Sequence, residues 1–137
     1  MSLPERFRFP PPVADLIGLE FHGAEDGRSR MSLEAGERHS NPMGTVHGGI
    51  LCDLADAAMG TAWASQLGDG ETFTTLELKI NYLRPVWAGS LVAEGRVVHR
   101  GRSIGLVECD IRDGDGRLLA RASSTCMTLR GDSAAGR

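Results

Sequence analysis

The chain has 137 residues, a net charge of −3 and a pI near 5.8, which fits a single domain over residues 1–137 that needs no cross-links to hold its core. Lysine and arginine are scattered singly and no apolar run approaches the ~20 residues that span a bilayer, so we expect neither a nucleic-acid partner nor a membrane span. Cys52, Cys109 and Cys126 lie far apart without a C-x-x-C pair, which argues against disulfides or a zinc knuckle and favours the cytoplasm.

The first part of the chain predicts a short helix and a hairpin. Residues 1–9 mix charged and aromatic side chains without a period, so we expect them to be flexible. Pro10-Pro11-Pro12 favour extended or helix-starting backbone, and Val13–Gly18 is predicted to form a short helix. Leu19–Gly23 and Arg28–Leu33 alternate in polarity around a turn sequence, as the two strands of a hairpin do.

A polar, glycine-containing loop then leads into a long helix. Residues 34–44 have the composition of an irregular loop. The helix is predicted to begin near His47 and to end by Gly68-Asp69-Gly70. Its apolar side chains recur at three- and four-residue steps, which is typical of a helix that buries one face; they are Ile50, Leu51, Leu54, Ala55, Ala58, Met59, Ala62 and Trp63.

After this helix the period changes to two, which predicts strands. Residues 73–82 alternate up to Arg84-Pro85, and Leu91–Arg100, Ser103–Asp113 and Arg117–Leu129 continue as strands. Turn sequences separate these four strands, so we expect three meander connections and antiparallel order. The pattern predicts the α+β class: one antiparallel sheet with a helix on one face. The remaining residues, 130–137, are predicted to form a frayed tail.

The start of the long helix has the chemistry to stabilise negative charge. Its first backbone N–H groups lack intrahelical partners and carry a positive partial charge. Gly48 and Gly49 let a substrate approach that backbone closely. Asp53 and Asp56 project from the less apolar flank of the same helix, so a carboxylate lies within two turns or so of the glycine pair.

These residues resemble a known family. Asn41, Gly44, His47-Gly48-Gly49 and Asp56, followed by residues 79–85 (KINYLRP), are similar to the hotdog-fold acyl-CoA thioesterases. The resemblance covers roughly residues 36–129 and is to the branch that contains the phenylacetate-pathway thioesterase, within the 4-hydroxybenzoyl-CoA thioesterase-like superfamily. It implies a sheet of about six strands wrapped around one long helix.

The resemblance implies catalytic roles for Asp56 and Gly48. Asp56 would act as nucleophile or as general base on water, and the Gly48 N–H would bind the thioester carbonyl. An unperturbed carboxylate is ionised at neutral pH and suits either role. Without the family context, Asp56 reads as a solvated helix carboxylate, and Gly48 and Gly49 read as a simple loop-to-helix transition.

Three further residues are implied as parts of the site. His47 would orient the thioester or the Asn41 side chain, and is otherwise an N-cap neighbour or a packed histidine. Asn41 would hold the hydrolytic water, although Asn41-Pro42 is also a good turn-starting pair. Thr75 would position the water or the carboxylate; the neighbouring Thr74 is the alternative, and an ordinary strand residue is the simpler reading.

The predicted coenzyme A contacts are a glycine and a set of strand-end residues. The three phosphates of coenzyme A need cationic or N–H partners, and the resemblance assigns these to Gly49, Arg84, Arg100, Arg102 and Ser103. Solvated charge at strand ends is the competing reading. The remaining histidines show no metal-ligand spacing, so neither a metal nor another cofactor is predicted.

The function predicted from these residues is hydrolysis of an acyl- or aroyl-CoA thioester to the free acid and CoA. A non-catalytic acyl-CoA-binding module is the alternative. A hotdog enoyl-CoA hydratase is disfavoured, because no histidine follows Asp53 or Asp56 at the five-residue distance typical of that class. Unpaired edge strands and the small residues Ala57, Gly60 and Ala64 on one helix flank predict a homodimer or a homotetramer of two dimers.

Overall fold

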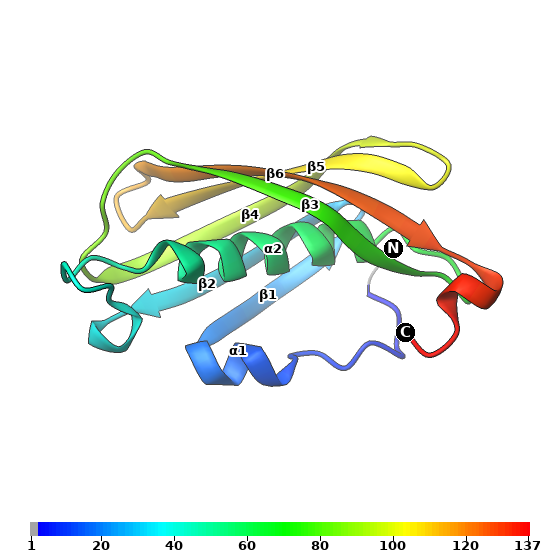
Figure 1. The fold of residues 1–137 in the computed structure, drawn as a ribbon, viewed down its shortest axis with the longest axis horizontal. Helices are drawn as coiled ribbons and strands as arrows, with labels where there is room; N and C mark the ends of the chain where they lie inside the picture. The colour runs from blue at the N-terminus through cyan, green and yellow to red at the C-terminus, as the bar shows by residue number, and fades with distance from the viewer. Residues whose placement is uncertain (1–2) are drawn as a thin grey trace.

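The computed structural model describes residues 3–137 and has one antiparallel sheet curled around one long helix (Figure 1). The long helix is α2 (Gly48–Ala64), and a short helix, α1 (Pro12–Ile17), precedes the sheet. The strands are β1 (Leu19–Glu25), β2 (Arg28–Ala35), β3 (Thr72–Tyr82), β4 (Gly89–Arg100), β5 (Ile104–Asp113) and β6 (Leu118–Leu129). The α+β prediction of about six strands wrapped around one helix is confirmed.

The order of the strands corrects one part of the predicted topology. The sheet runs β1-β2-β4-β5-β6-β3, so β3 pairs with β6 at the edge of the sheet and not with β4. The hairpin β1–β2 and the meander β4–β5–β6 form as predicted. The prediction of a third meander connection, between β3 and β4, is wrong. Turn residues mark where a strand ends, but they do not determine which strand it pairs with.

The core lies between α2 and the concave face of the sheet. Gly95 on β4 allows the closest approach, because a Cβ at this position would lie 2.4 Å from the Ala58 carbonyl oxygen. Fully burying each large apolar side chain here contributes roughly 1.5–3 kcal/mol to folding. The helix side chains that the periodicity predicts are buried, apart from the half-buried Ile50; they include Leu51, Leu54, Met59 and Trp63. Thr61 and Ala64 of α2 are buried as well. The sheet contributes Met31, Leu33, Leu91, Val107 and Ile111.

Both ends of α2 are fixed by side chains. At its start the side chain of His47 caps the helix, so the predicted beginning near this residue is confirmed. The helix ends at Ala64, four residues before the predicted stop at Gly68. Ser65 accounts for this, since its Oγ donates to the Ala62 carbonyl at 2.7 Å and accepts the Gly27 N–H at 2.8 Å. The chain therefore turns at a contact with the β1–β2 hairpin.

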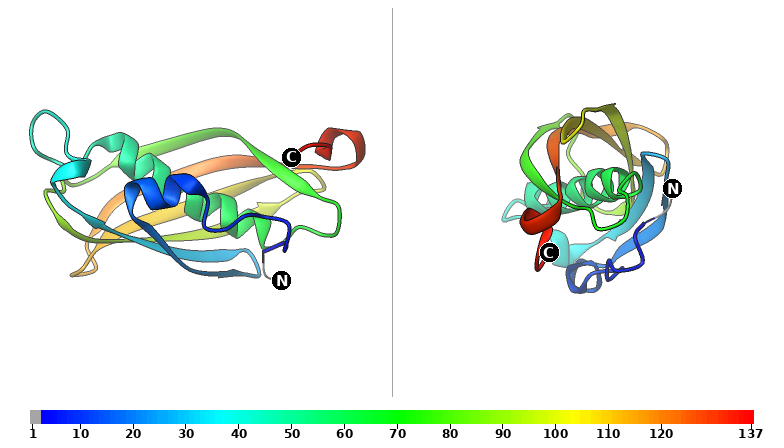
Figure 2. Two further views of the ribbon diagram at one scale, coloured as in Figure 1. Left: turned by 90° about the horizontal axis from the view of Figure 1, so that it is seen from below. Right: turned by 90° about the vertical axis from the view of Figure 1, so that its right-hand side faces the viewer.

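The N-terminal segment covers the open side of the curled sheet. The two edge strands, β1 and β3, do not meet, and α2 is reached between them (Figure 2). Residues 7–11 and α1 lie across this opening, where Phe7 and Phe9 pack against the core. The flexibility predicted for residues 1–9 stays a prediction, and residues 1 and 2 lie outside the described residues. No helix within residues 3–137 is long and apolar enough to cross a membrane.

The C-terminal residues also have defined contacts. A 3₁₀ helix, Gly131–Ala134, forms where the sequence predicts a frayed tail. The Arg130 guanidinium pairs with Glu71 at 2.5 Å and donates to Ser103 Oγ at 3.0 Å. These contacts join the tail to the β4–β5 turn and to the loop before β3.

Candidate active site

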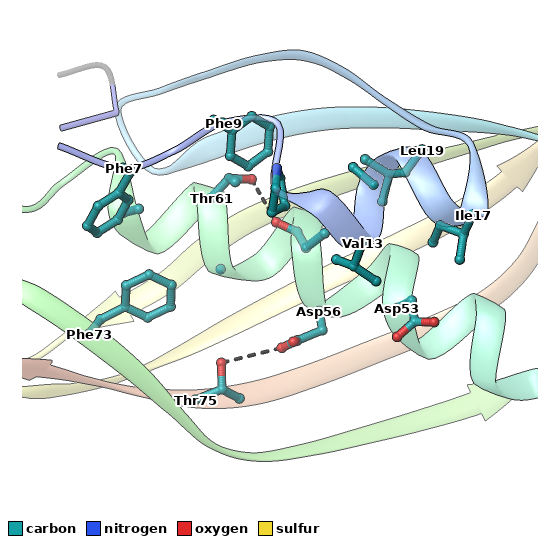
Figure 3. Close-up of a pocket in the computed structure, with 15 residues that line it drawn as sticks. Phe7, Phe9, Val13, Ile17, Leu19, Asp53, Asp56, Thr61, Phe73 and Thr75 are labelled. Carbon is teal, nitrogen blue, oxygen red and sulfur yellow. Dashed lines mark hydrogen bonds between the residues drawn. The ribbon is translucent and has the colours of Figure 1, made fainter. Parts of the chain in front are cut away.

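Asp56 lies on the side of α2 that faces the opening between the sheet edges. Its Oδ1 accepts a hydrogen bond from Thr75 Oγ1 on β3 at 3.3 Å, near the long limit for such a bond (Figure 3). Of the two threonines considered from the sequence, Thr75 is thus the one that contacts the carboxylate. The β3 strand brings the pair together across 19 positions of sequence.

The pKa of Asp56 is raised above its ordinary value. Desolvation is the main cause, because neighbouring atoms crowd the carboxylate although the residue remains exposed at the surface of the single chain. The hydrogen bond from Thr75 acts in the opposite direction, and the negative charge of Asp53 raises the pKa further. A raised pKa makes the ionised carboxylate a stronger base. Asp53, to which the sequence assigns only a favourable interaction with the helix dipole, therefore acts on the candidate catalytic group.

His47 is held rigidly at the start of α2. Its Nδ1 accepts the Gly49 N–H at 2.9 Å, and its backbone N–H donates to the His39 carbonyl at 2.8 Å. A neutral imidazole that accepts at Nδ1 carries its proton on Nε2, so the exposed edge of the ring is a donor. Because His47 occupies the Gly49 N–H, the Gly48 N–H is the one left at the helix start; within residues 3–137 it has no acceptor.

Tyr82 is a contributor to the helix start that sequence reasoning missed. Its hydroxyl donates to the Gly48 carbonyl at 2.9 Å and lies 3.3 Å from Cys52 Sγ. Desolvation and the hydrogen bond with Cys52 raise the pKa of Tyr82 to about 12. A Cβ on Gly48 would lie 2.7 Å from this hydroxyl, so glycine is required here for packing as well as for access. The resemblance includes Tyr82, but no local pattern indicates its contact across 34 positions.

Asn41 organises the loop that precedes the helix. Its Nδ2 donates to Thr45 Oγ1 at 2.7 Å, and its Oδ1 accepts the backbone N–H groups of Met43 and Thr45 at 3.0 and 3.1 Å. The turn-forming interpretation therefore describes its contacts in the single chain. Asn41 also lines a groove of about 360 Å³ together with Gly48 and Tyr82, so its amide remains close to the helix start.

The structure does not bring Gly48 and Asp56 of one chain to one point. They are eight residues apart on a regular helix, about 12 Å along its axis at ~1.5 Å per residue. Gly48 lines the groove with Asn41, whereas Asp56 lines a separate cavity with Thr75. A single carbonyl group cannot lie within ~3 Å of both.

Arg100 and Ser103 have contacts within the fold. The Arg100 guanidinium donates to the Gln66 carbonyl, pairs with Glu71 at 3.8 Å and lies over the Trp63 ring at 5.8 Å. Ser103 Oγ accepts from Arg130. These contacts lie at the far end of α2 from Gly48 and favour structural roles for both residues.

Arg84 and Arg102 retain exposed charge. Arg84 lies beside the helix start, in the groove that Gly48 lines. Arg102 lies in the β4–β5 turn and is exposed, and within residues 3–137 neither guanidinium has an ion-pair partner. These two guanidinium groups are available to coenzyme A phosphates, whereas the N–H of Gly49 is already donated to His47 Nδ1. The assignment to coenzyme A stays a prediction for Gly49, Arg84, Arg100, Arg102 and Ser103.

Two of the three histidines outside the helix start have structural partners, and the third, His99, is exposed. His39 is buried, with Nε2 at 2.7 Å from the Ile17 carbonyl oxygen and Nδ1 accepting the Gly36 N–H at 3.0 Å. His22 contacts Ser32 Oγ at 2.6 Å. Across residues 3–137 no group of three or more His, Cys, Asp or Glu side chains has the arrangement needed for a metal ion.

The curled sheet around a central helix, with a carboxylate on that helix and a glycine pair at its start, defines a hotdog fold with a hydrolase-type site. Residues 43–120 match the family described as the Thioesterase superfamily, and the chain belongs to this superfamily. It is accordingly a thioester hydrolase.

Individual relatives agree with this assignment. The chain is 31% identical over 113 residues to a 1,4-dihydroxy-2-naphthoyl-CoA hydrolase of Listeria monocytogenes, covering 82% of this chain and 92% of that protein. The solved structure of a conserved protein from Pseudomonas aeruginosa has a TM-score of 0.85 at 36% identity, covering 92% of this chain and all of the other. The PaaI protein from the E. coli phenylacetic acid degradation operon has a TM-score of 0.82 at 25% identity, covering 89% and 87%.

Proposed function

We propose that the chain hydrolyses an acyl-CoA thioester to the free acid and CoA. The observation that carries this proposal is the Asp56 carboxylate, held by Thr75 at a largely apolar cavity on the same helix whose start presents the Gly48 N–H. Membership of the Thioesterase superfamily supports the reaction type. The coenzyme A part of the substrate is supported by the Listeria relative, which is named as a CoA thioester hydrolase.

The proposed reaction uses Asp56 as a general base. Asp56 takes a proton from a water molecule as the water oxygen attacks the thioester carbonyl carbon. The carbonyl oxygen becomes an oxyanion that accepts the Gly48 N–H, a kind of contact commonly worth 10²–10³ in rate. The carbon–sulfur bond then breaks, and CoA leaves as the thiolate. The raised pKa of Asp56 makes its carboxylate a better acceptor for the water proton.

We further propose that two chains share each active site. The ~12 Å between Gly48 and Asp56 on one helix supports this, because a partner can place its carboxylate against the Gly48 N–H. The edge strand β3 is unpaired on one side within residues 3–137 and suits pairing with a second copy. A homodimer is the smallest such unit, and a homotetramer of two dimers is compatible with it. We also propose the cytoplasm as the location, since all three cysteines are free.

A thiol-release screen over short, medium, long and aryl CoA esters tests the proposed activity directly. Thiol release with at least one class, abolished in Asp56→Asn, is the expected result. Tight binding of CoA esters without thiol release would instead identify a binding module. Loss of enoyl absorbance without thiol release would identify a hydratase.

The charges around Asp56 predict the acid limb of the pH–rate profile. Because activity needs ionised Asp56, kcat/KM should fall on the acid side at a midpoint above the unperturbed value of about 3.9. Asp53→Asn removes a like charge, so it should move this midpoint to lower pH. Thr75→Val removes a hydrogen bond that favours the ionised form, so it should move the midpoint to higher pH. Thr74→Val is the matched control. If Asp53→Asn and Thr75→Val moved the midpoint in the same direction, the roles assigned to Asp53 and Thr75 would be contradicted.

The exposed arginines predict a salt-dependent effect on substrate binding. Arg84→Ala and Arg102→Ala should raise KM for CoA esters at low ionic strength by about two- to fivefold, the range of exposed ion pairs. The effect should shrink as salt rises, because ions screen exposed phosphate contacts. Arg30→Ala, on β2, is the control for lost charge alone. If both variants keep the wild-type KM at low salt, these arginines are solvated charge.

A further inference from the structure

A largely apolar cavity of about 280 Å³ runs along the open side of α2, beside Asp56. Its walls come from the N-terminal segment with α1 and the first residue of β1, from the flank of α2 that faces them, and from β3 (Figure 3). The rings of Phe7 and Phe73 lie at one end and Ile17 and Leu19 lie toward the other, with Asp56 between them and Asp53 nearer Ile17. The cavity therefore connects the candidate catalytic carboxylate to an aromatic end.

The floor of the cavity is made by small residues of α2. Ala57 and Gly60 line it, and Gly60 leaves room for the Phe73 ring, because a Cβ there would lie 3.2 Å from Phe73 Cζ. The sequence predicts that another backbone packs on this flank. Within the single chain the N-terminal segment lies over this flank, at a distance that leaves a cavity between them.

Aromatic side chains close the far end. The Phe7 and Phe73 rings are 6.2 Å apart between centroids with an interplanar angle of 40°. Phe9 is fixed against Phe21 on β1 by an edge contact at 4.4 Å. Such pairs contribute roughly 0.5–1.5 kcal/mol beyond the area they bury, so they can hold the N-terminal segment in place as a wall.

The cavity offers little to a polar ligand away from the carboxylates. Thr61 lines it, but its hydroxyl donates to the Ala57 carbonyl at 2.8 Å and is satisfied within the helix. Asp53 and Asp56 repel an anionic group. The ligand that fits is an uncharged apolar group attached to a carbonyl group that lies beside Asp56.

We propose that this cavity is the acyl pocket and that the N-terminal segment, through Phe7, sets the upper limit of acyl length. This inference rests on the proposed thioesterase function. A cavity of ~150 Å³ holds benzene, so the roughly twofold larger volume here corresponds to about six to eleven carbon atoms. The substrate class is an apolar acyl group of medium size. Palmitoyl is excluded by the Phe7–Phe73 end, and acetyl leaves the pocket largely empty.

Two substitutions test the pocket, one next to Asp56 and one at Phe7, with acetyl-, octanoyl- and palmitoyl-CoA as probes. Ala57→Leu fills the space next to Asp56 and should lower kcat/KM for octanoyl-CoA by about 10- to 200-fold, while acetyl-CoA changes by less than about threefold. Phe7→Ala opens the far end and should raise kcat/KM for palmitoyl-CoA by about tenfold relative to octanoyl-CoA. Leu16→Ala is the matched control, because Leu16 lies on α1 with 76% of its surface exposed and does not line the cavity.

The outcomes separate this inference from the proposed function. Suppose that wild type hydrolyses CoA esters while Phe7→Ala and Ala57→Leu both leave the octanoyl-to-acetyl and octanoyl-to-palmitoyl rate ratios unchanged. In that case the acyl group binds elsewhere, and only the pocket assignment is overturned. If wild type hydrolyses none of the three but releases thiol from an aryl CoA ester, the inference about acyl length is overturned and the proposed function stands; if it releases thiol from no CoA ester, both fail. Should Ala57→Leu not fold, the palmitoyl ratio of Phe7→Ala decides alone.

Discussion

Asp56→Asn should lower kcat by about 10²–10⁴-fold, the usual contribution of a positioned acid–base group. The amide keeps the shape of the side chain and can still contact Thr75, but it cannot take a proton from water. KM should change little, since the carboxylate binds no part of the substrate in the proposed mechanism. Steady-state thiol release with octanoyl-CoA measures both constants.

The same variant should be more stable than wild type at neutral pH. The folded protein holds Asp56 at a raised pKa, so the ionised carboxylate destabilises the fold once the pH exceeds that value. Below the unfolded pKa of about 3.9, Asp56 is protonated in both the folded and the unfolded state, and its burial costs no charge desolvation. This stability is lost as the pH rises through the pKa of Asp56 in the folded protein. The gain in Tm of Asp56→Asn should therefore be present at pH 7 and shrink in acid.

A matched aspartate controls both measurements. Asp53→Asn removes a carboxylate three positions away on the same helix and should retain most of kcat, because Asp53 acts only through the pKa of Asp56. A folded Asp56→Asn protein with near-wild-type turnover would exclude Asp56 from the chemistry. A Tm gain that persists unchanged at acid pH would show that burial of the charge is not its cause.

Mixing two inactive variants should restore activity if two chains share each site. Asp56→Ala removes the base and leaves the helix start intact, whereas His47→Ala removes the side chain that orients the helix start and leaves the base intact. After subunit exchange, half of the dimers are mixed and one of their two sites is complete, so recovery should approach about a quarter of wild-type activity. Asn41→Ala chains can replace His47→Ala as the second partner.

The controls for this experiment concern assembly. Sedimentation of each variant and of the mixture must show dimers or larger assemblies, and each variant alone must stay inactive under the exchange conditions. Exchange without recovered activity would place both groups of a working site in one chain. A wild-type protein that is fully active as a monomer would exclude sharing altogether.

The elements of the fold were predictable because each carries a local period. The three- and four-residue steps of Leu51, Leu54 and Trp63 follow from which face of α2 is buried. In β3 the alternation of burial holds only over residues 77–81, after the bulge between Thr75 and Glu77. The position of β3 beside β6 was not predictable in the same way. The connection to β4 is compatible with either neighbour, and pairing is decided by the closure of the sheet around α2.

The candidate site likewise combines features that the local sequence indicates with contacts that only the tertiary structure shows. The spacing of Gly48 and Asp56 on one helix is a local property, and the sequence indicates both. The contact of Tyr82 with Gly48 and the internal partners of Arg100 join residues 34 positions apart, so they depend on tertiary packing. The Phe7 wall depends on how the N-terminal segment crosses the open side of the sheet, which a segment without periodicity does not reveal.

Strand β3 touches both halves of the proposed site, because Thr75 contacts Asp56 and Tyr82 contacts Gly48. Because β3 has a bulge between Thr75 and Glu77, two such strands paired antiparallel about a two-fold axis at Lys79 would set Thr75 opposite the partner's Tyr82, and hence a carboxylate near a helix start. The register of this pairing then determines whether the carboxylate and the N–H group meet. A slip by two residues would preserve the backbone hydrogen bonds between subunits and yet give an assembled, inactive dimer.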